Sequence, residues 1–182
     1  MANIINSITS GAGGLSTSAD SSGILQLQSN GTTIMTIGST GVTTQVGAPA
    51  FRAYLSSTQT ISSATTTKVT LNAENFDTNS NFDTTTNYRF TPTVAGYYQI
   101  NGVVTFTTGA GQAAIFKNGS RYLTGVEVTY NASLGGHIPI SDLVYLNGST
   151  DYIELYVYLT TGTTISSGDT NTIFSGSMVR SA

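Results

Sequence analysis

Residue types that could carry chemistry are sparse in this sequence, and the histidine is the first to consider. His137 is the only histidine of the chain. A serine hydrolase needs a histidine beside a nucleophilic serine, but no Gly-x-Ser-x-Gly motif is present to hold such a serine. A hydrogen-bonded or exposed histidine at the end of a strand is therefore the better interpretation.

The carboxylates lack the spacing of a catalytic or metal-binding set. Asp151 and Glu154 are three residues apart on one expected strand, so they face opposite sides and cannot form the acid pair of a glycosidase. Glu74, Asp77 and Asp83 share a polar segment, but they do not follow an EF-hand loop or another dense pattern of oxygen ligands. We interpret these three as solvated loop residues.

Glycine-rich stretches and Asn-Gly pairs are interpreted as turns. The stretches at 11–14 and 108–112 lack the Lys-Ser/Thr that ends a phosphate-binding loop. Asn30-Gly31, Asn118-Gly119 and Asn147-Gly148 match the N-glycosylation pattern, but hairpin turns explain them better. We therefore expect no catalytic residue, no metal and no cofactor, and hence a protein that is not an enzyme.

The composition narrows the class of partner. Only 8% of the 182 residues are charged, against roughly 25% in an average globular protein. The net charge is −3, and six cations are scattered singly, which argues against nucleic acid as a partner. There is no cysteine for a disulfide or a thiolate metal site. We see neither a secretory signal nor an apolar run of roughly 20 residues, so we expect no membrane insertion.

The elements that must position these residues are strands. Thr, Val, Ile and Tyr dominate the apolar runs, and turn residues separate them at the spacing typical of a sandwich. The expected strands are 51–55, 67–71, 87–91, 95–107, 111–117, 121–129, 137–146, 150–159 and 172–180. Residues 1–48 are expected to form an extended arm followed by a hairpin around Asn30-Gly31, and residues 49–182 a single all-β domain.

Two strands have an aromatic face left over after the core is assigned. In 151–159, Ile153, Leu155, Val157 and Leu159 should point to the core, while the tyrosines point the other way. In 95–107, Tyr98 and its even-numbered neighbours should face the core and Tyr97 the opposite side. Either the tyrosines merely cover the sheet, or they form the interface of a symmetric homo-oligomer. We favour the interface, with Phe51, Tyr54, Tyr97, Tyr152, Tyr156 and Tyr158 as its residues.

Five segments resemble, in order, the globular domain of the C1q-like family. They are PAFRAYL (49–55), YRFTPTVAGYYQINGVVTF (88–106), AAIFKNGS (113–120), LNGSTDYIELYVYL (146–159) and TIFSGSMVRSA (172–182). The resemblance implies a jelly-roll sandwich related to the tumour necrosis factor module, assembled as a homotrimer. The sequence departs from the animal proteins in lacking a collagen stalk and in having Met178-Val179-Arg180 in place of their closing apolar run.

The segment ADSSGILQLQSNGTTIMTI (19–37), followed by this domain, is similar to structural proteins of tailed bacteriophages. The similarity implies a virion protein that is assembled in the host cytoplasm, released by lysis and located on the virion exterior. We expect a trimeric capsid decoration (cement) protein that binds the major capsid protein or another virion protein. Its attachment residues would be Ile4, Ile5, Ile8 and Leu15 of the arm.

Two other placements remain open from the sequence. The chain could be the receptor-binding tip of a short tail fibre, or a free C1q-like ligand or lectin. In the virion placements, a loop with Phe76, Asp77, Phe82 and Asp83 could adhere to a glycan of the host cell surface.

Overall fold

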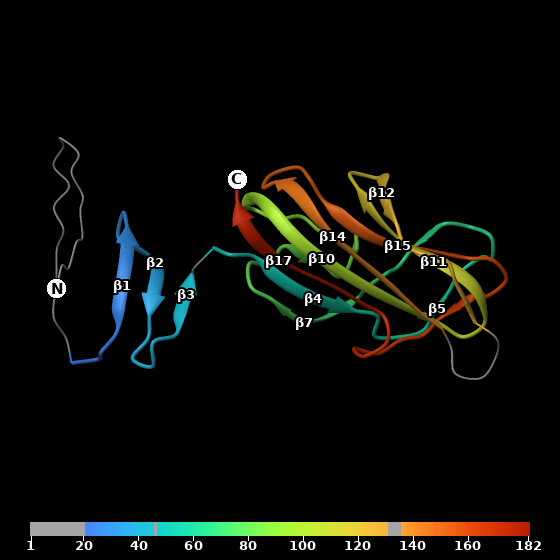
Figure 1. Cartoon of the computed structure of the whole chain (residues 1–182), viewed down its shortest axis with the longest axis horizontal. Coiled ribbons are helices and arrows are strands. Elements are labelled where there is room, and N and C mark those ends of the chain that lie inside the picture. Colours follow the sequence, from blue (N-terminus) through green and yellow to red (C-terminus); the bar gives the residue numbers. More distant parts are fainter. Residues whose placement is uncertain (1–20, 46, 131–135) are drawn as a thin grey trace. The chain divides into compact units, whose positions relative to one another are not determined.

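The structure is a computed structural model that describes residues 21–45, 47–130 and 136–182. The chain divides into two compact units, residues 1–46 and residues 47–182. The described residues contain strands and turns but no helix (Figure 1). These ranges therefore contain no helix that is long and apolar enough to cross a membrane. The arm residues Ile4, Ile5, Ile8 and Leu15 lie outside the described residues.

The first unit contains a three-stranded antiparallel sheet. It consists of β1 (Leu25–Ser29), β2 (Thr32–Ile37) and β3 (Thr43–Gln45). Asn30 and Gly31 join β1 to β2 with φ angles of 48° and 75°, the left-handed conformations that a two-residue hairpin turn requires. The predicted hairpin is thus confirmed, and β3 extends it where the sequence indicated a connector.

In the described part of residues 47–182, the strands form two seven-stranded antiparallel sheets. The first is called the β10 sheet (Figure 1). Five of its strands lie side by side, in the order β14 (Gly136–Asn147), β10 (Ala95–Phe106), β17 (Ile173–Ser181), β4 (Ala50–Tyr54) and β7 (Ala73–Asp77). The two short strands β16 (Thr164–Ile165) and β5 (Gln59–Thr60) continue the sheet at the end of β10. The second is called the β15 sheet. Its main strands follow the order β12 (Ser120–Thr124), β11 (Gly109–Lys117), β15 (Ile153–Leu159), β9 (Arg89–Phe90) and β8 (Phe82–Asp83). In addition, β13 (Val128–Tyr130) pairs with β11, and β6 (Thr67–Lys68) pairs with β15.

The alternation of residue type along two strands builds the core between these sheets. The inward residues of β10 (Tyr98, Ile100, Val104, Phe106) and of β15 (Ile153, Leu155, Val157, Leu159) are all 0% exposed. Both predicted core faces are therefore confirmed. The Tyr98 hydroxyl donates a hydrogen bond to the carbonyl oxygen of Val94 at 2.7 Å, and burial raises the pKa of Tyr98 to about 12.

Phe51 belongs to this core and not to a surface, which corrects its assignment to an intersubunit interface. Its side chain is 1% exposed. Its ring centroid lies 4.2 Å from that of Phe90 and 5.2 Å from that of Phe82, in stacked arrangements. Phe82 is itself 8% exposed, so it is not available for adhesion either. The sequence showed alternation along β4 but not which side of that strand faces the second sheet.

The turns also differ in part from the prediction. Asn118 and Gly119, with φ angles of 53° and 76°, form the predicted hairpin turn between β11 and β12. Asn147-Gly148 does not form a hairpin, because it connects β14 of one sheet to β15 of the other. Within the segment expected to be a polar loop, β7 pairs with β4, and β8 pairs with β9.

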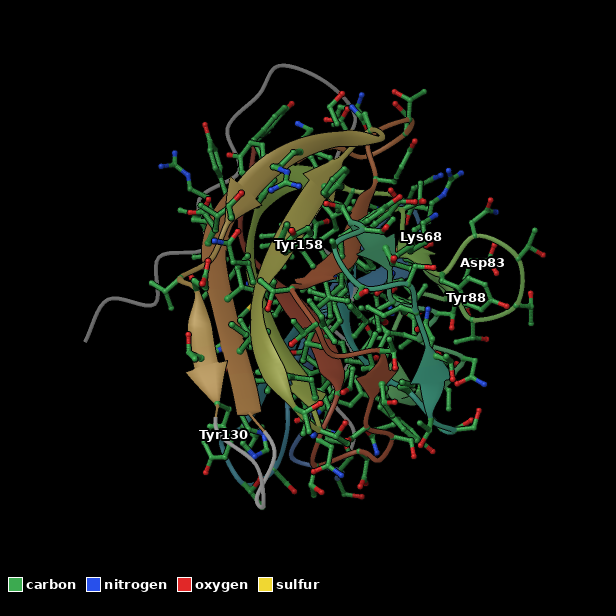
Figure 2. The ribbon with its side chains drawn as sticks, turned by 90° about the vertical axis from the view of Figure 1, so that its right-hand side faces the viewer. Lys68, Asp83, Tyr88, Tyr130 and Tyr158 are labelled. Carbon is green, nitrogen blue, oxygen red and sulfur yellow. The ribbon has the colours of Figure 1, made fainter. Side chains whose placement is uncertain are left out.

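The loop between β8 and β9 is fixed by Asp83 (Figure 2). Its Oδ1 accepts hydrogen bonds from the backbone N–H groups of Thr85 and Thr86, both at 2.9 Å, and its Oδ2 accepts one from the N–H of Asn87 at 3.0 Å. These donors stabilise the carboxylate, and they hold the pKa of Asp83 well below its usual range. The side chain thus organises its own loop.

We predict that Phe51→Ala lowers the free energy of unfolding by about 3–5 kcal/mol, because it leaves a cavity among aromatic rings. Chemical denaturation at a fixed protein concentration, followed by tyrosine fluorescence, measures the change. Tyr122→Ala on β12 is the matched control, since that side chain is 48% exposed; its loss should cost about 0.5 kcal/mol or less. Equal effects of the two substitutions would contradict the core position of Phe51.

We also predict that Asp83→Asn lowers stability at pH 7 and that the difference between the two proteins narrows in acid. The folded-state pKa of Asp83 is depressed, so its contribution is present above the unfolded-state pKa of about 3.9 and decreases as the pH falls below it. Thermal unfolding of both proteins between pH 7 and pH 2 measures this narrowing. Glu127→Gln, at an exposed carboxylate that contacts the Gln112 amide, is the control. A difference that stays constant down to pH 2 would contradict the role given to the charge.

Candidate self-association surface

The outer face of the β10 sheet collects exposed apolar side chains. Of the seven large apolar residues exposed in the described part of residues 47–182, five lie on strands of this sheet. They are Leu143 (48% exposed) and Tyr145 (40%) on β14, Tyr97 (44%) on β10, Val179 (62%) on β17 and Phe76 (48%) on β7. Exposed apolar residues that gather on one face indicate a contact surface.

The register of the strands arranges this face in rows. Tyr145 is opposite Tyr97, and their ring centroids are 5.5 Å apart. A second apolar row runs Pro139, Val103, Ile173, Tyr54 across four strands. Two further rows lie between them. The first consists of Leu143, Gln99, Ser177 and Ala50, and the second of Ser141, Asn101, Ser175 and Arg52. The two apolar rows therefore flank two rows in which hydroxyl and amide groups are mixed with Leu143, Ala50 and Arg52, and such a mixture is found in protein interfaces.

Four polar side chains of the face already have hydrogen-bond partners within the chain, namely those of Gln99, Ser141, Asn101 and Arg52. The Gln99 Nε2 donates to the Ser141 Oγ at 2.9 Å, and that hydroxyl donates to the Asn101 Oδ1 at 2.8 Å. The Arg52 guanidinium donates to the Asn75 side chain and to the Asp169 carbonyl oxygen. Because these groups are held by internal bonds, covering them would not leave many of them without a partner.

The edge strand β14 is built against lateral pairing with another strand. In the described structure it pairs with β10 along one side, and it carries Pro139 and Asp142. A proline cannot donate to a ladder and a charged residue disfavours one, so both residues protect an edge strand. Association at this sheet is therefore expected to use its face and not its edge.

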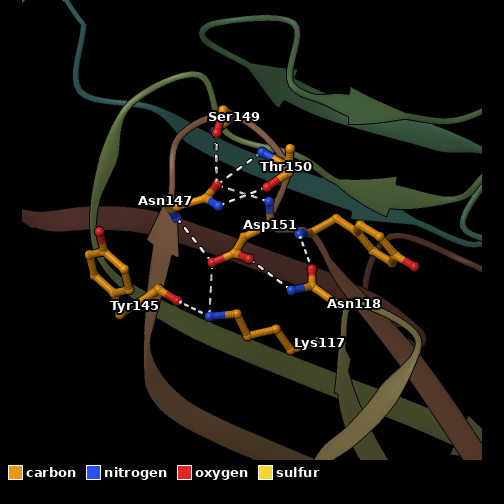
Figure 3. Close-up of polar contacts among 8 residues, drawn as sticks. Lys117, Asn118, Tyr145, Asn147, Ser149, Thr150 and Asp151 are labelled. Carbon is orange, nitrogen blue, oxygen red and sulfur yellow. Dashed lines mark hydrogen bonds and ion pairs between the residues drawn. The ribbon is translucent and has the colours of Figure 1, made fainter.

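A polar network holds the end of β14, next to Tyr145 (Figure 3). The Lys117 Nζ on β11 donates to the Tyr145 carbonyl oxygen at 2.7 Å and forms an ion pair with the Asp151 Oδ2 at 2.9 Å. The Asn118 Nδ2 donates to the Asp151 Oδ1 at 2.7 Å, and this hydrogen bond, together with Lys117, lowers the pKa of Asp151. The Asn147 Oδ1 accepts from the backbone N–H groups of 149–151 at 2.9–3.0 Å.

Among the described residues, three rings on the outer face of the β15 sheet have a cation beside them, compared with one ring, that of Tyr145, on the β10 sheet. The Tyr156 ring stacks on Phe116, with centroids 3.9 Å apart. The Lys68 Nζ lies 5.9 Å from the Tyr156 ring centroid and forms an ion pair with the buried Glu154 at 2.5 Å. Arg121 lies over Phe116, and Arg89 lies 4.0 Å from the Tyr152 centroid. Lys68 and Tyr158 are marked in Figure 2.

The six residues predicted as one interface thus fall into three places. Phe51 is in the core, and Tyr54 and Tyr97 are on the outer face of the β10 sheet. Tyr152, Tyr156 and Tyr158 precede or belong to β15, in the other sheet. The two sets therefore lie on different sheets and do not form one continuous patch on a subunit. The sequence analysis missed Leu143 and Tyr145, although β14 alternates as clearly as β15.

The residues considered for chemistry have structural partners. The Thr105 hydroxyl donates to the Asn171 carbonyl oxygen at 2.7 Å, and its oxygen lies 2.8 Å from the His137 Nδ1. Asp151 pairs with Lys117, and Glu154 pairs with Lys68. Asp77 accepts from the backbone N–H groups of Asn79 and Phe82. Among the residues that the structure describes, no three His, Asp or Glu side chains gather to hold a metal ion.

The fold of residues 47–182 is a C1q/TNF-like jelly roll, as comparison with solved structures shows. The globular domain of the zebrafish complement 1qA protein matches with a TM-score of 0.59 and 16% identity, covering 74% of this chain and 99% of that one. Murine APRIL at pH 8.0 matches with a TM-score of 0.56 and 10% identity, covering 72% and 99%. The PRD1 vertex protein P5 matches with a TM-score of 0.55 and 17% identity, covering 72% and 97%. No protein-family model and no curated protein sequence matches the chain.

Proposed function

We propose that this chain is a non-enzymatic structural protein of a virion exterior, which assembles as a homotrimer through the outer face of the β10 sheet. The observation that carries the proposal is the row pattern of this face, in which Tyr97, Leu143 and Tyr145 are exposed together on a jelly roll. A contact that buries about 800 Å² on each subunit would be of the stable kind.

The β10 sheet is a better interface than the β15 sheet for an energetic reason. The rings of the β15 sheet already contact Lys68, Arg89 and Arg121. Covering them would remove these cations from water, which costs free energy unless new partners replace the water. On the β10 sheet one cation is affected in the same way, because the Lys117 Nζ lies 5.7 Å from the Tyr145 ring centroid. Burying the exposed Leu143 and Tyr97 beside it gains the apolar contribution.

The trimeric state and the virion location rest on similarity. The C1q-like family that the sequence resembles assembles as a trimer, and the PRD1 vertex protein P5, by its name a vertex protein, has the same fold. Within the virion, we propose a capsid decoration (cement) role, in which residues 1–46 bind the major capsid protein and the jelly roll points outward. Bridging neighbouring shell subunits would strengthen the shell. The receptor-binding tip of a short tail fibre is the alternative placement.

We predict that Leu143→Asp weakens trimer association by roughly 100-fold or more, because an unpaired charge buried in an interface costs about 3–5 kcal/mol. Sedimentation equilibrium over a concentration series measures the effect, and circular dichroism checks that the monomer is folded. Tyr158→Asp, on β15 of the other sheet, is the matched control and should remain trimeric. If Tyr158→Asp dissociates the trimer and Leu143→Asp does not, the interface belongs to the β15 sheet.

The cement role predicts that the purified protein binds capsids that lack it. Cryo-electron microscopy of the mixture should show trimers at the three-fold positions, with residues 1–46 lying along the shell. A preparation without residues 1–46 is the control and should leave the shells bare. Bare shells with the full chain, together with binding of the trimer to host cells, would place the protein at the tail and make adhesion its function.

A further inference from the structure

The three-stranded sheet of β1, β2 and β3 has no core of its own. No described residue between 21 and 45 is buried. Leu25 is 52% exposed, Leu27 41% and Ile34 46%. A sheet this small is not stable in water unless one of its faces packs against something else.

The register separates an apolar face from a polar face. Leu25 is opposite Ile37, and Leu27 is opposite Met35, so these four aliphatic side chains share one face. The other face carries Gln26 opposite Thr36, which in turn is opposite Thr44. Ile34 lies at the irregularity between the two strands and has no cross-strand partner. The sheet is therefore amphipathic, and its apolar side is the one that requires a cover.

The absence of charge indicates what kind of cover fits. Residues 21–51 contain no Asp, Glu, Lys or Arg. In a symmetric assembly each side chain near the axis meets its own copies, so any charge on this face would meet a like charge. A face of Leu, Met and Ile without charges has no such repulsion. It also lacks the charges that usually keep exposed strands from associating.

The chain geometry brings copies of this sheet together. Gln45, the last residue of β3, and Ala50, the first residue of β4, are separated by residues 46–49, which span at most about 18 Å. β4 belongs to the β10 sheet, whose outer face forms the proposed interface, and Ala50 lies in one of its rows. Trimerisation of the jelly rolls would therefore hold three sheets at a high effective concentration.

From these observations we propose that the apolar face formed by Leu25, Leu27, Met35 and Ile37 packs against the same face of the other two subunits. The partner is thus a second and a third copy of this chain. The proposal rests on the trimer proposed above and adds a separate contact in the N-terminal unit. The Gln and Thr face points outward in this arrangement, where water satisfies it.

Because the chain has no cysteine, single cysteine substitutions test this contact cleanly. Leu25→Cys, Leu27→Cys, Met35→Cys and Ile37→Cys place a thiol on the apolar face, and Gln26→Cys, Thr36→Cys and Thr44→Cys place one on the polar face. A disulfide forms only when two Cβ atoms come within about 4.5 Å. Each full-length variant is oxidised mildly and run on a denaturing gel, while light scattering reports its oligomeric state.

We expect at least one apolar-face variant to form covalent dimers and the polar-face variants to stay monomeric on the gel. A trimer has three thiols, and one disulfide joins two of them and leaves the third without a partner. The fraction of chains in the covalent dimer should therefore approach two thirds. A reaction with a maleimide adds a second readout, in which apolar-face thiols should react at least ten times more slowly than polar-face thiols.

The remaining outcomes separate this inference from the proposed function. Trimers without crosslinks, with protected apolar-face thiols, would mean that another part of the same chain covers the face, and trimers with reactive thiols would mean that nothing covers it. Either result overturns the inference and leaves the jelly-roll trimer intact. Monomers by light scattering would overturn both. Crosslinking from both faces alike would also contradict a specific packing and would indicate nonspecific collision.

Discussion

The packing of β10 between β14 and β17 is the constraint on which the rest of this fold depends. A strand of twelve residues with neighbours on both sides must point alternate side chains into the core. Tyr98, Ile100, Val104 and Phe106 fill the space toward the second sheet, and Tyr97 is then forced outward. Gly96 is required at the crowded end of this strand, because a Cβ there would lie 2.4 Å from the Arg180 carbonyl oxygen. The same alternation thus creates both the core and the exposed face.

A chain with 8% charged residues must fix its loops by other means, and it uses amide, hydroxyl and a few carboxylate groups. Asn147 alone accepts hydrogen bonds from three successive backbone N–H groups. Asp83 does the same in the loop before β9. In the described residues, no buried side-chain nitrogen or oxygen lacks a hydrogen-bond partner. Local polar networks, joined at Asp151 by an ion pair with Lys117, therefore hold these loops.

Much of the fold could be predicted from the sequence, because alternation is a local property. The pattern of β10 and β15 identified which side chains face the core, and Asn118-Gly119 identified a hairpin. The sheet to which a strand belongs depends on contacts distant in the sequence, and this was not predictable. Tyr97 and Tyr156 therefore seemed to share a surface, although they lie on different sheets. For the same reason Asn147-Gly148 looked like a hairpin turn, although it connects two sheets.

The two units differ in how they treat exposed strands, and this difference bears on assembly. In the jelly roll, the edge strand β14 carries Pro139 and Asp142, and the edge strand β7 carries Glu74 and Asp77, so lateral pairing is opposed at both. The sheet of residues 25–45 has no charged residue and no proline to oppose association. A chain that associated first through this sheet would have little to limit the number of copies. In the proposed trimer, association through the outer face of the β10 sheet would fix that number, so the order in which the two proposed contacts form would decide whether the product is a closed assembly or an aggregate.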